Sequence, residues 1–146
     1  MEKDVLKISI TIEYHTIIGY RNPPLPRDLL QIAEREIENY AKSAGGTLQI
    51  HEERMPYVNS LTIGGLHFNF SRRIIKYMIT IPIPRDSIIV EESYRKVKKS
   101  SKELTERLFN LLNSEIEKRR ISIDIFRTYP RECMSLRPFI CISSLV

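Results

Sequence analysis

The sequence has no tryptophan, only five glycines and two cysteines, and no long apolar run. No segment approaches the roughly 18 consecutive apolar residues of a membrane-spanning helix, so we expect no transmembrane segment. Residues 2–4 are charged and are not followed by the apolar core of a signal peptide, which favours a cytoplasmic protein. The cysteines, Cys133 and Cys141, match no C-x-x-C metal or redox spacing. We interpret them as reduced thiols, with a disulfide as the alternative if the source is a hyperthermophile.

The local motifs of several enzyme classes are also missing. The chain contains no G-x-G-x-x-G, no G-x-x-x-x-G-K-[ST] and no G-x-S-x-G, so phosphate-binding loops and a nucleophile elbow lack support. The paired H-x-[ST] signature of two-histidine phosphoesterases and a D…E-x-K nuclease pattern are absent as well. These absences favour a non-enzymatic protein without a cofactor.

The composition is that of an ordinary globular domain enriched in isoleucine. The 146 residues are 42% hydrophobic and 28% charged, the common size and composition of one domain, so we predict a single domain over residues 1–146. The chain holds 22 isoleucines against 13 leucines. β-Branched residues favour sheet.

The first third of the chain predicts a strand and then a helix. Apolar and polar residues alternate strictly over residues 6–15, which predicts a strand with one face in the core and one face wet. Residues 27–43 carry apolar residues at three- and four-residue steps, with Pro26 suited to the start of a helix and Gly45 and Gly46 to its end.

Residues 47–83 predict a β-meander. A strand over 47–53 precedes a hairpin over 61–68 with a Gly-Gly turn, in which Ile63 faces Leu66. One strand with a glycine bulge is the alternative. An isoleucine-rich strand follows at 74–83, and it could pair with another copy of the chain through an exposed sheet edge or face.

The second helix has two possible starts. Ser100 and Glu103 form a capping box, which places its start near Ser101 and its end near Arg120. Alternatively the helix begins near Glu91, because its apolar stripe continues backwards. The first start leaves the neighbouring lysines on a loop, whereas the second places them along a helical face.

Strands at 121–126 and 139–142 complete the prediction. Strands mixed with two helices indicate an α+β fold, a largely antiparallel sheet with both helices packed on one face. We expect a ferredoxin-like plait variant with an inserted β-hairpin.

The net positive charge of the chain comes entirely from its second half. Residues 1–73 balance nine Lys and Arg against nine Asp and Glu, whereas residues 74–146 hold fourteen against nine. Three basic clusters stand out: Arg72, Arg73 and Lys76; Arg95, Lys96, Lys98, Lys99 and Lys102; and Lys118, Arg119 and Arg120. A basic patch is the usual footprint of a polyanion partner.

We therefore predict a small nucleic-acid-binding module that contacts phosphates of DNA or RNA through these eleven residues. Tyr77, Tyr94 and Phe126 are candidates for stacking on bases. The first alternative is a homo-oligomeric protein-assembly component, because Phe109 and Leu112 widen the apolar stripe of the second helix. In either case we expect a homodimer.

The second alternative is an acid–base or metal-dependent enzyme. His15, His51 and His67 all fall on the polar register of predicted strands, as do Glu13 and Asp124, so one sheet face could gather them. No two histidines have a local metal-binding spacing, and no metal site is predicted.

Overall fold

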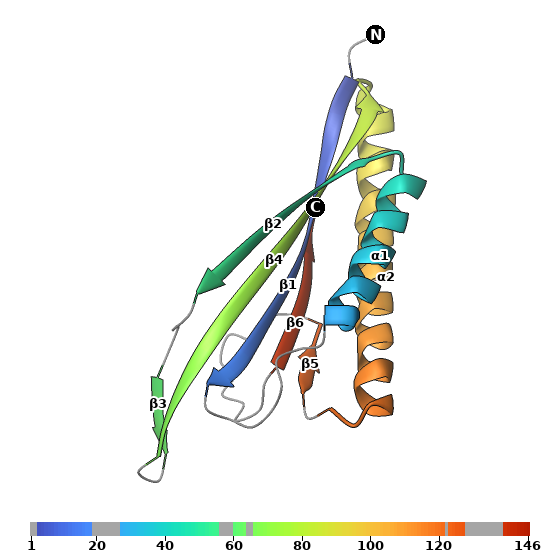
Figure 1. Cartoon of the computed structure of the whole chain (residues 1–146). Helices are drawn as coiled ribbons and strands as arrows, with labels where there is room; N and C mark the ends of the chain where they lie inside the picture. The colour runs from blue at the N-terminus through green and yellow to red at the C-terminus, as the bar shows by residue number, and fades with distance from the viewer. Residues whose placement is uncertain (1–2, 19–26, 56–59, 64–65, 122, 128–138) are drawn as a thin grey trace.

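The computed structural model describes residues 3–18, 27–55, 60–63, 66–121, 123–127 and 139–146. These residues form an α+β structure in which two helices cover one face of a mixed sheet (Figure 1). The elements in chain order are β1 (Lys3–Ile18), α1 (Arg27–Ser43), β2 (Thr47–Met55), β3 (Ser60–Ile63), β4 (Leu66–Pro84), α2 (Ser87–Lys118), β5 (Asp124–Phe126) and β6 (Phe139–Leu145). Neither helix is both long and apolar enough to cross a membrane, within the part of the chain described.

The sheet has the strand order β2-β4-β1-β6-β5, and β3 pairs with the far end of β4. Every pairing is antiparallel except that of β5 with β6. β1 pairs with β4 along its whole length, whereas β6 pairs only with residues 9–15 of β1. Residues 3–8 of β1 therefore have a described neighbour on one side only.

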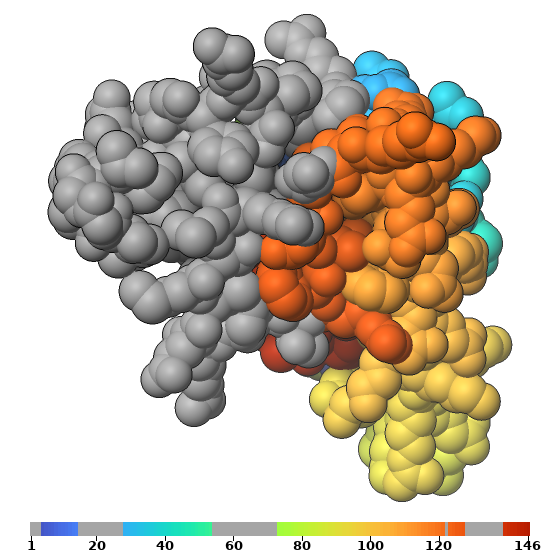
Figure 2. All heavy atoms as spheres, turned by 90° about the horizontal axis from the view of Figure 1, so that it is seen from below, coloured from blue at the N-terminus to red at the C-terminus, as the bar shows by residue number. Residues whose placement is uncertain are grey.

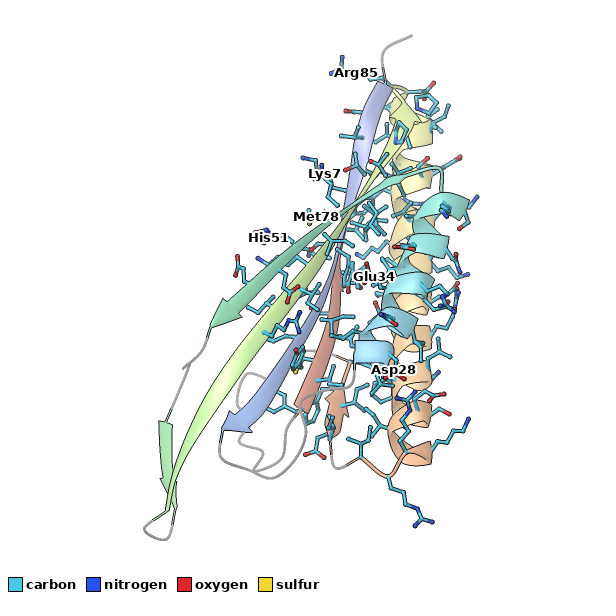
Figure 3. The ribbon with its side chains drawn as sticks, in the orientation of Figure 1. Lys7, Asp28, Glu34, His51, Met78 and Arg85 are labelled. Atoms are coloured by element: carbon cyan, nitrogen blue, oxygen red, sulfur yellow. The ribbon has the colours of Figure 1, made fainter. Side chains whose placement is uncertain are left out.

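The alternation predicted for the first strand is confirmed. Ile8, Ile10 and Ile12 are fully buried beneath the helices, and the matching β4 residues Tyr77 and Ile79 are buried beside them. On the other face, Lys7, His51 and Met78 extend away from the helices (Figure 3). This hydrophobic layer between sheet and helices is the main core.

The opposite face is not wet throughout, which corrects the prediction. Around Glu13, the facing residues Ile74 and Cys141 are buried as well, and Phe139 lies on the same side. Glu13 is only 5% exposed. A strand covered on one face shows the same alternation of apolar and polar residues as β1. The sequence pattern therefore could not reveal that part of the second face is also buried.

β4 corrects a second expectation. The sequence predicts a hairpin strand ending at Phe68 and a separate strand at 74–83, but one strand runs from Leu66 to Pro84. Residues 69–73 continue the ladder because β1 extends to Ile18 and pairs with them. The hairpin register itself is confirmed, with Ile63 opposite Leu66, while its turn lies outside the described residues.

β4 is also an interior strand. It pairs with β1 on one side and with β2 on the other, so residues 74–83 offer no exposed edge. The expectation that this strand could pair with another copy through an exposed edge is wrong, whereas pairing through its face stays a prediction. The late strands form close to where they were predicted, with β5 shorter and β6 longer than expected.

The end of α1 follows the predicted glycine signal. Gly45 adopts a positive φ of 70°, and the Gly46 amide donates to the Ala41 carbonyl at 2.8 Å. Such a left-handed residue closes a helix by satisfying its last carbonyls. The helix buries Leu29 and Ile37 against the sheet.

α2 begins at Ser87, four residues before the earlier of its two predicted starts. Asp86 caps it, since its carboxylate accepts from the amides of Ile88 and Ile89. A start near Ser101 is wrong. Ser100 lies inside the helix, where its hydroxyl bonds the Val97 carbonyl at 3.1 Å and the Tyr40 hydroxyl of α1 at 2.6 Å. Ser100 therefore does not cap a helix. Its hydroxyl contacts α1, and the resemblance to a capping box is coincidental.

The apolar residues of the wide stripe of α2 contact other parts of the same chain. Leu104, Leu108 and Leu112 are buried in the main core. Phe109 lies on another side, where the Arg127 guanidinium stands 5.0 Å from the centre of its ring. The width of the stripe therefore does not by itself call for a protein partner.

Candidate nucleic-acid interface

The solvent-facing side of α2 carries four cations, Arg95, Lys98, Lys99 and Lys102, which we call the basic band. All four side chains are exposed. At 3.6 residues per turn they fall within an arc of about 100°, so they share one side of the helix. They extend over about 10 Å of the helix axis. Because the helix starts at Ser87, the band is held on a regular element rather than on a loop.

Few acidic groups compensate the band. Arg95 pairs with Glu91 one turn earlier at 2.8 Å, and both side chains are largely exposed. The Lys98 ammonium lies 6.0 Å from the centre of the Tyr94 ring. Among the described residues, no ion pair reaches Lys98, Lys99 or Lys102. These three ammonium groups are available to an anion.

Lys96 stands apart from the band. It lies about 100° from Arg95 around the helix, on the side that faces α1. There it lines a groove of about 410 Å³ between the two helices, whose floor includes Ile81 and whose walls include Tyr40 and Ser100. The hydroxyls of Tyr40 and Ser100 bond each other, so they already satisfy one another.

The first basic cluster does not join the band. Arg73 lies beside Tyr14, donates to its hydroxyl at 2.7 Å and forms an ion pair with Glu52. Lys76 is exposed on the face of the sheet away from the helices, since it alternates with the buried Ile75 and Tyr77.

Arg72 pairs in register with His15, but its side chain lies outside the described residues. The structure therefore does not bring this cluster together with the cations of α2.

The third cluster lies at the opposite end of α2. Lys118 follows Lys102 by sixteen residues, about 24 Å of helix. Arg119 forms an ion pair with Asp28 at the start of α1 and a second with Glu115 at 3.2 Å. Viewed from below, this end of α2 lies against the start of α1 (Figure 2). Arg120 is exposed and adopts a positive φ of 54°.

The pair between Asp28 and Arg119 predicts a pH dependence of stability. The hydrogen bond from Arg119 lowers the pKa of Asp28 below its ordinary value. A lowered folded-state pKa stabilises the fold above the unfolded-state value of about 3.9, and the contribution is lost as the pH falls through the folded-state pKa. D28N is therefore expected to unfold at lower urea than wild type at pH 7, by a small margin because solvent screens the pair.

The measurement is urea unfolding of both proteins at pH 7 and at a pH below the carboxyl range. The difference at pH 7 should vanish in acid, and E38Q, which changes an exposed carboxylate of the same helix, serves as the control. A difference that persists unchanged in acid would show that Asp28 acts other than through its charge.

Of the three stacking candidates, the structure leaves one exposed. Tyr77 is 1% exposed in the main core, where burial, with Glu34 nearby, raises its pKa. Phe126 is half-buried, and its ring centre lies 6.0 Å from that of Phe139. Tyr94 is 40% exposed beside Lys98. Tyr77 is therefore wrong as a stacking residue, and Tyr94 is the aromatic that adjoins the band.

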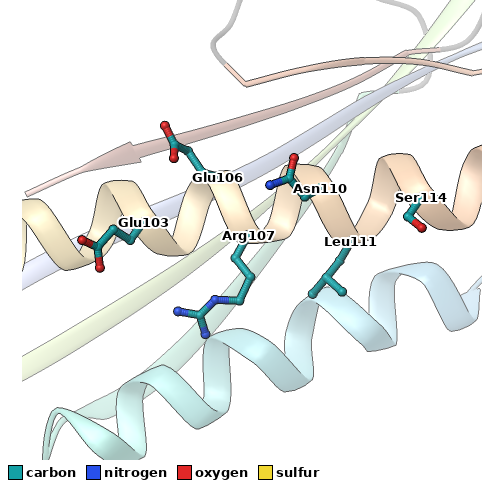
Figure 4. Close-up of a pocket in the computed structure, with 6 residues that line it drawn as sticks. All are labelled: Glu103, Glu106, Arg107, Asn110, Leu111 and Ser114. Carbon is teal, nitrogen blue, oxygen red and sulfur yellow. The ribbon is translucent and has the colours of Figure 1, made fainter.

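Acidic residues end the band on its C-terminal side. A shallow groove of about 380 Å³ on the surface of α2 is lined by Glu103, Glu106, Arg107, Asn110, Leu111 and Ser114. Arg107 and Leu111 extend toward α1, while Glu106 extends away from it (Figure 4). Arg107 contacts Glu36 of α1 at 3.4 Å. With two carboxylates and a paired guanidinium, this groove does not suit a phosphate.

The histidines lie far apart along the sheet. In register, His51 is opposite Lys76 and His15 is opposite Arg72, while His67 is itself part of β4. Positions 76, 72 and 67 are four and five residues apart, or about 13 and 16 Å.

His51 is exposed and lies 3.2 Å from Glu53. The described residues contain no group of three His, Cys, Asp or Glu side chains able to hold a metal ion.

Reasoning from the sequence missed Asp86, the residue that caps α2 and so places the basic band on a helix. The available signal for the helix start was Asp86 followed by Ser87, shortly after Pro84. This start places the later cations at regular helical positions. Comparison with known proteins adds no further assignment: no family model, no curated protein and no solved structure matches the chain.

Proposed function

We propose that this protein binds nucleic acid through the basic band of α2, by contacts to backbone phosphates. The observation that carries the proposal is the grouping of four exposed cations within about 10 Å of one helix side, with one described ion pair among them. Backbone contacts do not read base identity, so neither DNA nor RNA is singled out. Tyr94 offers a ring on which an unpaired base can stack.

The size of the band sets the strength expected. About 10 Å corresponds to about three nucleotides at a rise of 3.4 Å per strand, so one chain contacts three or four phosphates. The logarithm of the association constant should then fall with the logarithm of salt concentration, with a slope of about −2.7 to −3.6 on duplex DNA and about −2.1 to −2.8 on single strands. Affinity without base readout is in the micromolar range or weaker at physiological salt.

We infer further that the architecture is a ferredoxin-like plait variant. The order β2-β4-β1-β6 with the helices after β1 and β4 supports it, because these elements form two interleaved βαβ units. The hairpin of β3 with β4 and the short β5 are additions to that plan. The plait inference stands apart from the binding proposal.

The binding proposal is tested by fluorescence anisotropy with labelled single- and double-stranded DNA and RNA across a salt series. The band variant R95Q/K98Q/K99Q/K102Q removes four charges. The control K7Q/K76Q/K118Q/R120Q removes four exposed charges elsewhere.

The band variant should bind about 100-fold more weakly at low salt and lose most of its salt slope, because it loses its phosphate contacts. The control should keep a slope close to that of wild type. Equal losses in the two variants would mean that total charge, not the band, attracts nucleic acid. No binding by wild type at low salt would reject the proposal.

A further inference from the structure

The strand β1 offers an unpaired edge at one end of the molecule. β4 covers one side of β1 throughout, but β6 ends opposite Ser9. Over residues 3–8, no described strand lies on the other side. Backbone N–H and C=O groups along such an edge are a template for another strand.

Exposed apolar side chains gather at the same end. Six large hydrophobic side chains are exposed among the described residues. Five of them lie on β1, at the end of β6 or in the first turns of α2: Val5, Ile88, Ile89, Tyr94 and Leu145. The sixth, Ile50, lies on β2 at the other edge. α2 also extends beyond α1 toward this end (Figure 1). Val5 and Leu145 share the face of the sheet that points away from the helices, because Val5 alternates with Leu6 and Ile8 and Leu145 is opposite Ser9. Ile88, Ile89 and Tyr94 lie on α2, on the other side of the sheet, so these side chains do not form one continuous patch.

Two contacts fix which side of α2 borders the unpaired edge. Ser100 and Arg107 contact α1, which covers the β2 side of the sheet. Tyr94 and Lys98 fall on the other side of the helix, the side of Phe109 and its contact with Arg127 after β5. β1 has its unpaired edge on that side.

The charges of this part of α2 are arranged by sign along the helix. Within the helix, Glu91 and Glu92 precede residue 94, whereas Arg95, Lys96, Lys98 and Lys99 follow it. Asp86 caps the helix and follows Arg85, and Glu91 also pairs with Arg95 of its own chain. Two such helices run in opposite directions complement each other, because the acidic half of one meets the basic half of the other. A partner with the same charge order is therefore favoured when it binds antiparallel.

From the unpaired edge and the charge order together, we propose that a second copy of this chain binds here, through antiparallel pairing of β1 with β1. A two-fold axis perpendicular to the sheet keeps both pairs of helices on one face, and it makes the interface self-complementary. It also requires that opposed residues lie on the same face of β1.

Two registers meet this requirement near the middle of the edge. Centring on Val5 opposes Lys3 to Lys7 of the second copy, which is unfavourable for like charges. Centring on Leu6 opposes Val5 to Lys7 and uses residues 4–8, stopping before Ser9, which β6 occupies. The Leu6-centred register is therefore preferred.

This register also aligns the helices. Leu6 lies three residues from Lys3, whose partner Pro84 lies three residues before the start of α2. The axis therefore passes about 10 Å along the helix, near residue 93. Asp86 and Glu91 of one copy then lie toward Arg95 and Lys98 of the other. Lys99 and Lys102 keep facing solvent, whereas Arg95 and Lys98 lie at the interface, so in the dimer each copy leaves half of its basic band open to an anion. The dimer does not depend on nucleic-acid binding.

The experiment is light scattering after size exclusion, without nucleic acid, at about 10–100 µM chain. Wild type should have twice the chain mass of 17.2 kDa. V5K should weaken dimerisation at least tenfold, because each substitution counts twice and opposes Lys7 with a second lysine. I50K is the matched control, since Ile50 is 48% exposed on the other edge and Val5 is 50% exposed.

A monomeric wild type, or a V5K variant that dimerises as wild type does, would overturn the proposal. So would dissociation by I50K in place of V5K, which would assign the dimer to β2. E91K should weaken the dimer and E91K/K98E should recover it, and failure to recover would reject the antiparallel helix pairing. Hydrogen exchange on wild type needs no variant: amides of residues 4–8 should gain protection with concentration and those of β2 should not.

Discussion

Replacing Ser101 with proline is expected to destabilise the protein by about 3 kcal/mol or more, whereas proline at Ser87 should change stability by less than about 0.5 kcal/mol. The two serines lie in the same helix, fourteen residues apart. The contrast tests whether α2 is one continuous helix that begins at Ser87.

The loss at Ser101 has two sources. Proline removes the amide that bonds the carbonyl four residues earlier, and its ring clashes with that carbonyl. Ser101 is also 1% exposed, and its hydroxyl bonds the Lys98 carbonyl at 3.0 Å, so the site has no spare room. A break here would also disturb the geometry of the basic band.

Ser87 is the first residue of the helix, where the amide has no helical partner. The carboxylate of Asp86 accepts from Ile88 and Ile89, and the first helical bond is donated by Val90. Asp86 has φ −129° and ψ 126°, the extended conformation that a residue before proline prefers. Proline at Ser87 therefore keeps every hydrogen bond of the cap.

Urea unfolding followed by circular dichroism measures both variants against wild type. The result is informative in either direction, because a helix that began at Ser101 would accept proline there as its first residue. A stable S101P variant would contradict the continuous helix and place the basic band on a loop.

The strands and helices were predictable from the sequence wherever one physical signal acted alone. The alternation of β1 and the glycines after Ser43 identified their elements, since period and backbone freedom are local properties. Ser100 and Glu103 misled because a hydroxyl in a helix–helix contact produces the same pattern as a cap. The length of β4 depended on pairing with the distant end of β1, which no local pattern contains.

The candidate site was predictable in part for the same reason. Cations close in sequence on one helix, such as Arg95 and Lys98, are held together by local geometry. Arg73 and Arg119 are instead taken up by Glu52 and Asp28, which are distant in the chain. Charge counts along the sequence cannot distinguish a cation that has such a partner from one that does not. For this reason the sequence predicted three basic clusters, whereas the structure leaves the basic band of α2 as the candidate site.

Truncating Leu108 to alanine is expected to cost about 2–5 kcal/mol of stability, because it removes a buried side chain and leaves a cavity. Leu108 is fully buried between α2 and the sheet, one turn from Leu104 and from Leu112. Leu111 offers the matched control, since it is a half-buried leucine of the same helix that lines the shallow groove and extends toward α1. L111A should lower the free energy of unfolding by about 1 kcal/mol or less, because the Leu111 side chain is already partly exposed to solvent and its removal leaves no closed cavity.

Both variants are compared by urea unfolding, with the slope of the transition checked for a common two-state change. The sequence alone assigned both leucines to the apolar stripe. The structure separates them, because Leu108 is buried in the main core whereas Leu111 extends toward α1 and is half-buried. A larger loss at Leu111 than at Leu108 would mean that α2 is rotated about its axis relative to the sheet. That rotation would also turn the basic band toward β5 or toward α1, so the core measurement and the binding measurement test the same orientation from opposite sides of the helix.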